Sequence, residues 1–157
     1  MKRKVYIETT IAGYLTARRN SDLVIAAHQA LTVEWWANHR HRFDLYVSDI
    51  VLCEAARGDE SAAAKRMVEQ QDIDVLGLDE RARELARVFI ERRLIPATAV
   101  EDALHVAVAT IEGMDFLLTW NCRHIANAEV AERLAGVCLE LGYRMPILCT
   151  PEQLMGD

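Results

Sequence analysis

The amino-acid sequence predicts an α/β fold, a three-layer sandwich whose central, mostly parallel sheet is flanked by helices. Short apolar runs of β-favouring residues recur along the chain and predict strands. Helical patterns separate these runs, as expected when parallel strands are joined by helical crossovers. With 157 residues, 52% of them hydrophobic, the chain can bury one sizeable core. We therefore expect residues 1–157 to form a single domain.

Five short apolar runs are the predicted strands. Each is bounded by charged or turn-forming residues, which is typical of strands buried inside a sheet. The predicted strands are residues 5–7, 43–47, 73–78, 116–118 and 147–149. In such a sheet the binding or catalytic site forms beyond the carboxyl ends of the strands.

Capping side chains mark where the predicted helices begin. The candidate caps are Thr9 or Thr10, Asp22, Ser48 or Asp49, Asp59, Asp79 and Thr150. The predicted helices run from about residue 9 toward 18, from 22 to about 38, over 50–58, from 59 to about 71, over 80–93, over 98–110, from about 128 to 141, and from 151 onward.

The helix predicted over residues 98–110 is apolar on nearly every side, so we expect it inside the core. Thr98 and Glu101 match a capping box, in which Glu101 bonds back to the Thr98 backbone N–H. Asp102 has no such partner, although it lies in the first turn, where the helix dipole favours an anion. An unpaired buried charge is costly, so a cation or several hydrogen-bond donors are expected at Asp102.

Four oxygen-bearing side chains are expected at the carboxyl edge of the sheet. Glu8 ends the first strand, Glu54 lies in the helix after the second, and Asp102 opens the buried helix. Asn121 follows the fourth strand. Carboxylates gathered in a poorly solvated place repel one another, and a divalent cation removes that repulsion. Oxygen ligands favour Mg²⁺ or Mn²⁺ over zinc, and such ions bind substrate phosphates, which suits phosphodiester hydrolysis.

Four stretches of the sequence resemble the PIN-domain ribonucleases, many of which are VapC-like toxins of type II toxin–antitoxin pairs. VYIETT is similar to the family's opening strand and first acid, and SDIVLCEA to the segment with its second acid. EDALHVAVA and LLTWNCRHI are the more specific matches, and they correspond to the third acid and the fourth polar position. The resemblance covers nearly the whole chain and implies a PIN-like fold.

The same resemblance implies roles for individual residues. Glu8, Glu54 and Asp102 would be catalytic metal ligands, with Mg²⁺ or Mn²⁺ as the cofactor. Asn121 would complete the catalytic set by orienting a ligand water or the substrate phosphate. The residues that would support the site are Thr9 and Thr119. The resemblance further implies RNA as the substrate, a small antitoxin as a partner and a homodimeric toxin.

Two positions depart from the family pattern. The first acid is usually Asp, whereas Glu8 is one methylene longer, and Asn121 stands where many members carry a fourth Asp. We therefore expect weak, metal-dependent cleavage of RNA. The alternative that these two residues leave open is a catalytically weakened PIN-like domain that acts as an RNA-binding or protein-interaction module.

Net charge and cysteine content argue against several other classes of protein. A formal net charge of −6 argues against a protein that holds nucleic acid by bulk positive charge alone. Basic groups at residues 2–4, 18–19 and 39–42 would either guide RNA phosphates toward the acids or be solvated surface charge. The four cysteines show no C-x-x-C spacing, and no segment approaches the length of a membrane span. We expect a soluble, cytoplasmic protein with reduced thiols.

Three further features allow two interpretations each. His105, one turn after Asp102, would be either a core histidine bonded to backbone or a contact of the site, and it stays outside the predicted catalytic set. Trp120 is either a core residue or a surface on which an RNA base stacks. Cys122 and His124 have the spacing of half a zinc site, but no second pair accompanies them, which argues against zinc.

Overall fold

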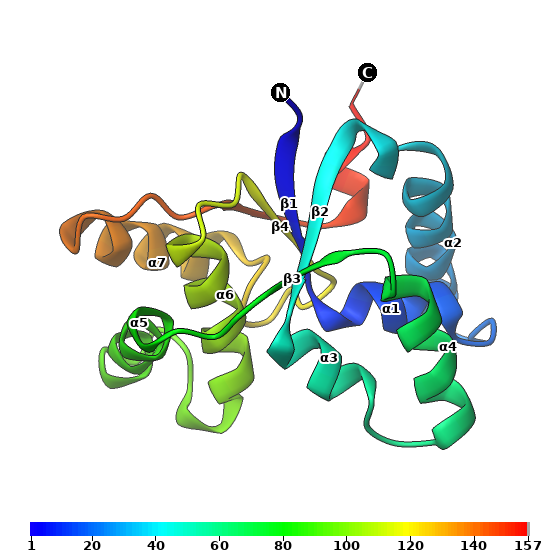
Figure 1. Ribbon diagram of the computed structural model, residues 1–157, viewed down its shortest axis with the longest axis horizontal. Helices are drawn as coiled ribbons and strands as arrows, with labels where there is room; N and C mark the ends of the chain where they lie inside the picture. The colour runs from blue at the N-terminus through cyan, green and yellow to red at the C-terminus, as the bar shows by residue number, and fades with distance from the viewer. Residues whose placement is uncertain (157) are drawn as a thin grey trace.

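A parallel five-stranded sheet forms the centre of the computed structural model, which describes residues 1–156 (Figure 1). The strands are β1 (Arg3–Ile7), β2 (Phe43–Ser48), β3 (Asp74–Leu76), β4 (Phe116–Leu118) and β5 (Ile147–Cys149). Their order across the sheet is β3-β2-β1-β4-β5, and every neighbouring pair is parallel. The predicted α/β class is confirmed, and each of the five predicted runs overlaps a strand.

Helices cover both faces of the sheet. They are α1 (Thr9–Thr16), α2 (Leu23–Asn38), α3 (Asp49–Ala55), α4 (Glu60–Gln70), α5 (Glu80–Glu91), α6 (Val100–Ile111) and α7 (Ala128–Glu140). Figure 1 shows α1, α2 and α4 on one side of the sheet and α5, α6 and α7 on the other. Short 3₁₀ helices lie at Arg40–Arg42, Ala97–Ala99 and Pro151–Leu154. Within residues 1–156, no helix combines the length and the apolar character that crossing a membrane requires.

The order of the strands reverses between β1 and β4. β2 and β3 lie on one side of β1, whereas β4 and β5 lie on the other. β1 and β4 are in register from Val5 beside Phe116 to Ile7 beside Leu118, so the chain leaves both strands side by side. The Glu8 backbone N–H donates to the Leu118 carbonyl at 3.0 Å. Open parallel sheets form their sites at the carboxyl end of such a reversal point.

Side-chain caps fix where several helices begin. Asp22, Asp59 and Asp79 accept hydrogen bonds from backbone N–H groups in the first turns of α2, α4 and α5, as predicted. Of the two candidate caps for α3, Ser48 makes the bond, because Asp49 already lies inside the helix. These caps set the positions at which α3 and α5 leave the carboxyl edge of the sheet.

α6 is the most deeply buried helix of the described chain, as its apolar sequence predicts. Its buried residues are Ala103, His105, Val106, Ala107, Val108, Ala109 and Thr110. α5 packs along α6 and covers it from the outside. The helix therefore presents its first two turns, which carry Asp102 and His105, to the space beyond the strands.

The start of α6 differs from the prediction. A 3₁₀ turn, Ala97–Ala99, precedes the helix, so Thr98 lies inside this turn and not at the cap. No side chain caps α6. Glu101 instead pairs with Arg57 through two hydrogen bonds of 2.7 and 3.1 Å. The predicted capping box is therefore wrong, because the turn moves the first helical residue beyond Thr98.

Candidate active site

Glu8 is the side chain that joins β1, α1 and the end of β4. It is 4% exposed, and its carboxylate accepts hydrogen bonds from the Thr10 backbone N–H (2.9 Å) and the Thr10 hydroxyl (2.7 Å). The Thr119 hydroxyl donates a third bond of 2.5 Å. Glu8 is thus the N-cap of α1 itself, and the predicted cap at Thr9 or Thr10 is wrong. Both carboxylate oxygens of Glu8 have protein donors.

Glu54 lies in the last turn of α3 and faces the same edge of the sheet. Its Oε1 accepts a hydrogen bond from the Thr9 hydroxyl at 2.9 Å and lies 2.5 Å from His105 Nε2. Burial raises the pKa of Glu54, but the hydrogen bond and the charge of His105, together with the Thr9 bond, lower it more. The pKa of Glu54 therefore lies below its ordinary value, and the side chain is an anion at neutral pH.

Asp102 lies in the first turn of α6 and is paired with His124. Asp102 Oδ2 lies 2.9 Å from His124 Nδ1, and both side chains are about a quarter exposed, at 22% and 24%. The partner that the sequence required for Asp102 is thus a histidine. His124 thus bonds to Asp102 through Nδ1, and Cys122 is an exposed free cysteine.

Asn121 shapes the loop that follows β4. Its Oδ1 accepts the backbone N–H groups of Arg123 (3.2 Å) and His124 (3.0 Å), while its own N–H donates to the Thr119 hydroxyl at 2.9 Å. The side-chain oxygen of Asn121 therefore holds the turn that presents His124 to Asp102. The amide nitrogen of Asn121 is the part of the side chain that remains for a water or a phosphate.

His105 lies between the acids, and sequence reasoning left it out of the site. It is fully buried, with Nε2 on Glu54 and Nδ1 2.7 Å from the Tyr6 hydroxyl. Burial lowers the pKa of His105, but the Glu54 hydrogen bond and the charges of Glu8, Glu54 and Asp102 raise it above its ordinary value. All three acids thus act on one imidazole ring.

The expected backbone-bonded core histidine is therefore wrong, because both ring nitrogens of His105 bond to side chains. The feature of the sequence that could have placed His105 in the site is its three-residue spacing from Asp102. A residue three positions after Asp102 in a helix lies on the same face and is carried to the same edge of the sheet.

The donor set suits a hard cation, but its arrangement is not that of a ready metal site. Carboxylate oxygens are the ligands that Mg²⁺ and Mn²⁺ prefer. Among residues 1–156, no three His, Cys, Asp or Glu side chains are placed to share one ion. In this arrangement each acid bonds to a hydroxyl, a backbone N–H or a histidine, although Glu54 Oε2 and Asp102 Oδ1 have no donor within the described chain.

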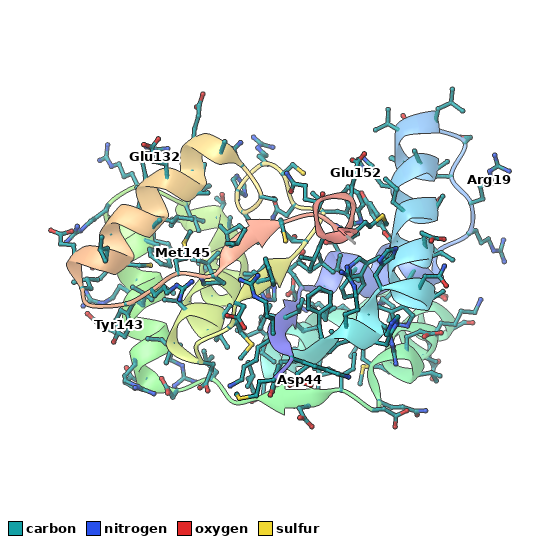
Figure 2. The ribbon with its side chains drawn as sticks, turned by 90° about the horizontal axis from the view of Figure 1, so that it is seen from above. Arg19, Asp44, Glu132, Tyr143, Met145 and Glu152 are labelled. Atoms are coloured by element: carbon teal, nitrogen blue, oxygen red, sulfur yellow. The ribbon has the colours of Figure 1, made fainter. Side chains whose placement is uncertain are left out.

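Two of the predicted basic groups lie at the wrong edge of the sheet to guide RNA toward the acids. Arg3 pairs in register with Phe43 at the start of β1 and β2, so residues 2–4 and 39–42 flank the amino edge. Figure 2 views the molecule from that side, with Arg19 on the outer loop beside α2. Arg57 is a cation beside the acids, and it pairs with Glu101, the neighbour of Asp102.

Trp120 is a packing residue. It is 8% exposed, and its indole N–H donates to the Thr32 hydroxyl at 2.7 Å. Its ring stacks on His28 with centroids 4.0 Å apart and an interplanar angle of 12°, and Tyr14 lies 6.1 Å away at 24°. Because one ring face is covered by His28, the core interpretation of Trp120 is supported over the base-stacking one.

The comparisons with known proteins identify the fold. No family model matches the sequence, and no curated protein does. The crystal structure of VapBC2 from Rickettsia felis, bound to a DNA fragment from its promoter, matches with a TM-score of 0.57 and 15% identity, over 94% of this chain and 98% of the other. VapC20 from Mycobacterium tuberculosis, a sarcin-ricin loop cleaving toxin, matches with a TM-score of 0.60 and 16% identity, over 76% and 92%. The resemblance seen in the sequence extends to the backbone, and the chain has the PIN-like α/β fold of these toxin structures.

Proposed function

We propose that this protein is a metal-dependent endoribonuclease that hydrolyses RNA phosphodiester bonds as the toxin of a toxin–antitoxin pair. One observation carries the proposal: Glu54 bonds both to Thr9, the neighbour of Glu8, and to His105, which lies one turn after Asp102, so acids from three separate elements gather at the carboxyl edge of the sheet. Three carboxylates at one edge of the sheet can bind a divalent cation, and such a cation in turn binds a substrate phosphate. The fold shared with the toxin structures supports this assignment.

In the proposed site, Glu8, Glu54 and Asp102 would hold Mg²⁺ or Mn²⁺, which activates water and offsets the charge that develops on the phosphate. The remaining roles belong to the protein. Thr119 holds Glu8 at the end of β4, and Thr9 holds Glu54 on α3. The Asn121 amide would orient the phosphate or a water, at a position fixed by its bonds to the loop backbone.

We further propose a small antitoxin as partner, a homodimer as the assembled toxin, and the cytoplasm, where RNA is found, as its location. α2 exposes several apolar side chains along its length, and these would be available to a protein partner. The exposed fractions are 83% for Leu23, 64% for Val24 and 50% for Val33.

A second function is favoured by the same hydrogen bonds that organise the site. Every acid already has a donor from the protein, and Glu8 has three. Together with Glu8 in place of Asp and Asn121 in place of a fourth acid, this supports a catalytically weakened module that binds RNA or protein without cleaving it.

Cleavage of a structured RNA, followed in parallel with calorimetric titration of Mn²⁺, separates the two functions. We expect the wild type to bind Mn²⁺ and to cleave, a chelator to stop cleavage, and Asp102→Asn to bind Mn²⁺ more weakly and to cleave about 10²–10³-fold more slowly. Asp44→Asn is the matched control, because Asp44 is an exposed acid of β2 at the other edge of the sheet (Figure 2). A folded wild type that neither binds Mn²⁺ nor cleaves contradicts the nuclease, and retention of RNA by that protein in a gel shift would support the module.

A further inference from the structure

A chain of side-chain hydrogen bonds runs through the core from the start of α3 to its end. The Ser48 hydroxyl lies 2.7 Å from the Tyr6 hydroxyl, which lies 2.7 Å from His105 Nδ1. His105 Nε2 then contacts Glu54 Oε1 at 2.5 Å. Ser48, Tyr6 and His105 are all completely buried, so no water competes for these bonds. The chain links β1, α3 and α6, the elements that carry or precede the three acids.

The direction of each bond follows from what the groups can donate. An ionised carboxylate only accepts, so Nε2 of His105 must carry the hydrogen toward Glu54. With a neutral ring, Nδ1 accepts the Tyr6 O–H and Tyr6 accepts the Ser48 O–H; with a protonated ring, Nδ1 donates to Tyr6 and Tyr6 donates to Ser48. Ser48 in turn accepts the backbone N–H of Val51 at 3.3 Å. In both cases Nε2 carries the hydrogen that reaches Glu54, and the Tyr6 hydroxyl holds the ring from the opposite side.

The bonds to Glu54 are asymmetric. Both of its donors, His105 Nε2 and the Thr9 hydroxyl, reach Oε1. Oε2 has no donor within residues 1–156. Two donors on one oxygen, one of them anchored through Tyr6 to the central strand, fix the rotation of the carboxylate. The other oxygen accepts no hydroxyl, backbone or imidazole hydrogen within residues 1–156, and the Glu101 carboxyl group lies within reach of Glu54.

We propose that His105 is a positioning residue: the Tyr6–His105 relay occupies Oε1 of Glu54 and thereby holds Oε2 ready for the cation of the proposed nuclease. This inference rests on the proposed function. A purely structural histidine would only fill space, and an apolar side chain of similar volume would serve as well. A positioning histidine must keep its donor, and donors behind metal-binding groups typically contribute about 10–100-fold in metal affinity or activity.

Four variants separate positioning from packing. His105→Leu keeps the volume and removes the donor, whereas His105→Gln supplies an amide N–H near the position of Nε2. Tyr6→Phe removes only the hydroxyl that holds the ring. Val108→Ala is the matched control, because Val108 is buried in the same helix and its side chain can take no part in the hydrogen bonds of the relay. Each variant is tested for Mn²⁺ affinity by calorimetry, for kcat and KM on the RNA, and for unfolding in urea.

We expect His105→Leu to weaken Mn²⁺ binding and to lower kcat by about 10–100-fold, with KM nearly unchanged. His105→Gln should recover most of that loss. Tyr6→Phe should fall between the wild type and His105→Leu. Val108→Ala should be less stable than the wild type while binding Mn²⁺ and cleaving RNA normally. If His105→Leu does not fold, Tyr6→Phe and His105→Gln still decide the question.

Nitrogen-15 NMR of the histidine rings gives a readout that needs neither metal nor activity. The spectrum of the wild type should show His105 with a proton on Nε2, and Tyr6→Phe should move the Nδ1 resonance; His105→Gln assigns the signal by removing it. A hydrogen on Nδ1 alone would overturn the relay.

The kinetic outcomes separate the two proposals. An active wild type whose folded Tyr6→Phe and His105→Leu variants bind Mn²⁺ and cleave RNA as it does would overturn the positioning role and leave the nuclease intact. A wild type that neither binds Mn²⁺ nor cleaves would overturn the nuclease, and the role of His105 in it.

Discussion

Two carboxylate–histidine pairs flank the candidate site, and they differ in how firmly the protein holds them. In the first pair His105 is 1% exposed, lies 2.5 Å from Glu54 and is braced from behind by Tyr6. In the second pair His124 is 24% exposed, lies 2.9 Å from Asp102 and stands on a loop. The first pair is part of the core, whereas the second can open without disturbing any strand or helix. One acid is therefore fixed, and the other is free to exchange its partner.

The largest expected effect tests whether Glu54 and Asp102 contribute equally to RNA cleavage, although only Glu54 is paired with a buried histidine. Glu54→Gln and Asp102→Asn should each lower kcat for RNA cleavage by about 10²–10³-fold, as the loss of a group that stabilises transition-state charge does. Single-turnover cleavage at saturating Mn²⁺ measures this. A loss confined to one variant would mean that only one of the two pairs belongs to the site.

The next effect concerns the stability of the fold. His105→Leu takes one of two donors from Glu54 and one of two partners from the Tyr6 hydroxyl, so that only Thr9 and Ser48 remain. It should lower the free energy of unfolding by about 1–3 kcal/mol. His124→Leu breaks a partly exposed pair and should lower it by less than about 1 kcal/mol. Urea unfolding followed by circular dichroism gives both values. Equal losses would show that the two pairs are equally embedded in the fold.

A smaller effect is expected when a diamagnetic ion is added. If Asp102 exchanges its histidine for the ion, the ring resonances of His124 should move during a Mg²⁺ titration more than those of His105. Histidine NMR spectra record the change, and Asp102→Asn serves as the control that should remove it. Larger shifts at His105 would indicate that the ion opens the buried pair instead.

The smallest effect is the difference in reactivity between the two thiols next to site residues and the two thiols in the core. All four cysteines are free; Cys53 beside Glu54 and Cys122 beside Asn121 are exposed, whereas Cys138 and Cys149 are buried. Burial raises the pKa of Cys138 to about 11 and that of Cys149 to about 12, so few thiolates form there at pH 8. Ellman's reagent should titrate two thiols in the native protein and four in urea. Four fast thiols in the native protein would contradict this burial.

Most of the fold could be predicted from the sequence because its signals are local. The runs 116–118 and 147–149 match β4 and β5 in full, since each is an apolar run with a sharp boundary. The run 73–78 was too long, because only residues 74–76 pair with β2 at the sheet edge. The capping box at Thr98 failed because its residue pattern carries no information about the 3₁₀ turn in which Thr98 lies.

The site was only partly predictable, because its contacts join distant parts of the chain. Strand direction alone brings Glu8, Glu54 and Asp102 to one edge, and it also assigns residues 2–4 to the opposite edge, a consequence that the hypothesis of RNA guidance overlooked. The partners of His105 are 51 and 99 positions away, at Glu54 and Tyr6. No periodicity or spacing reveals such partners, since they depend on how side chains meet across the core.

The pairing of β4 with β1 also has a consequence during synthesis of the chain on the ribosome. Glu8 and Thr119, which meet at the end of these strands, are 111 positions apart. At about 5–20 residues per second, translation needs roughly 6–22 s to pass from one to the other. During that interval the nascent chain has its first acid but lacks the strand that supports it. The supported site therefore requires a chain that has been translated past β4, and a nascent polypeptide that ends before Thr119 lacks the hydroxyl that holds Glu8.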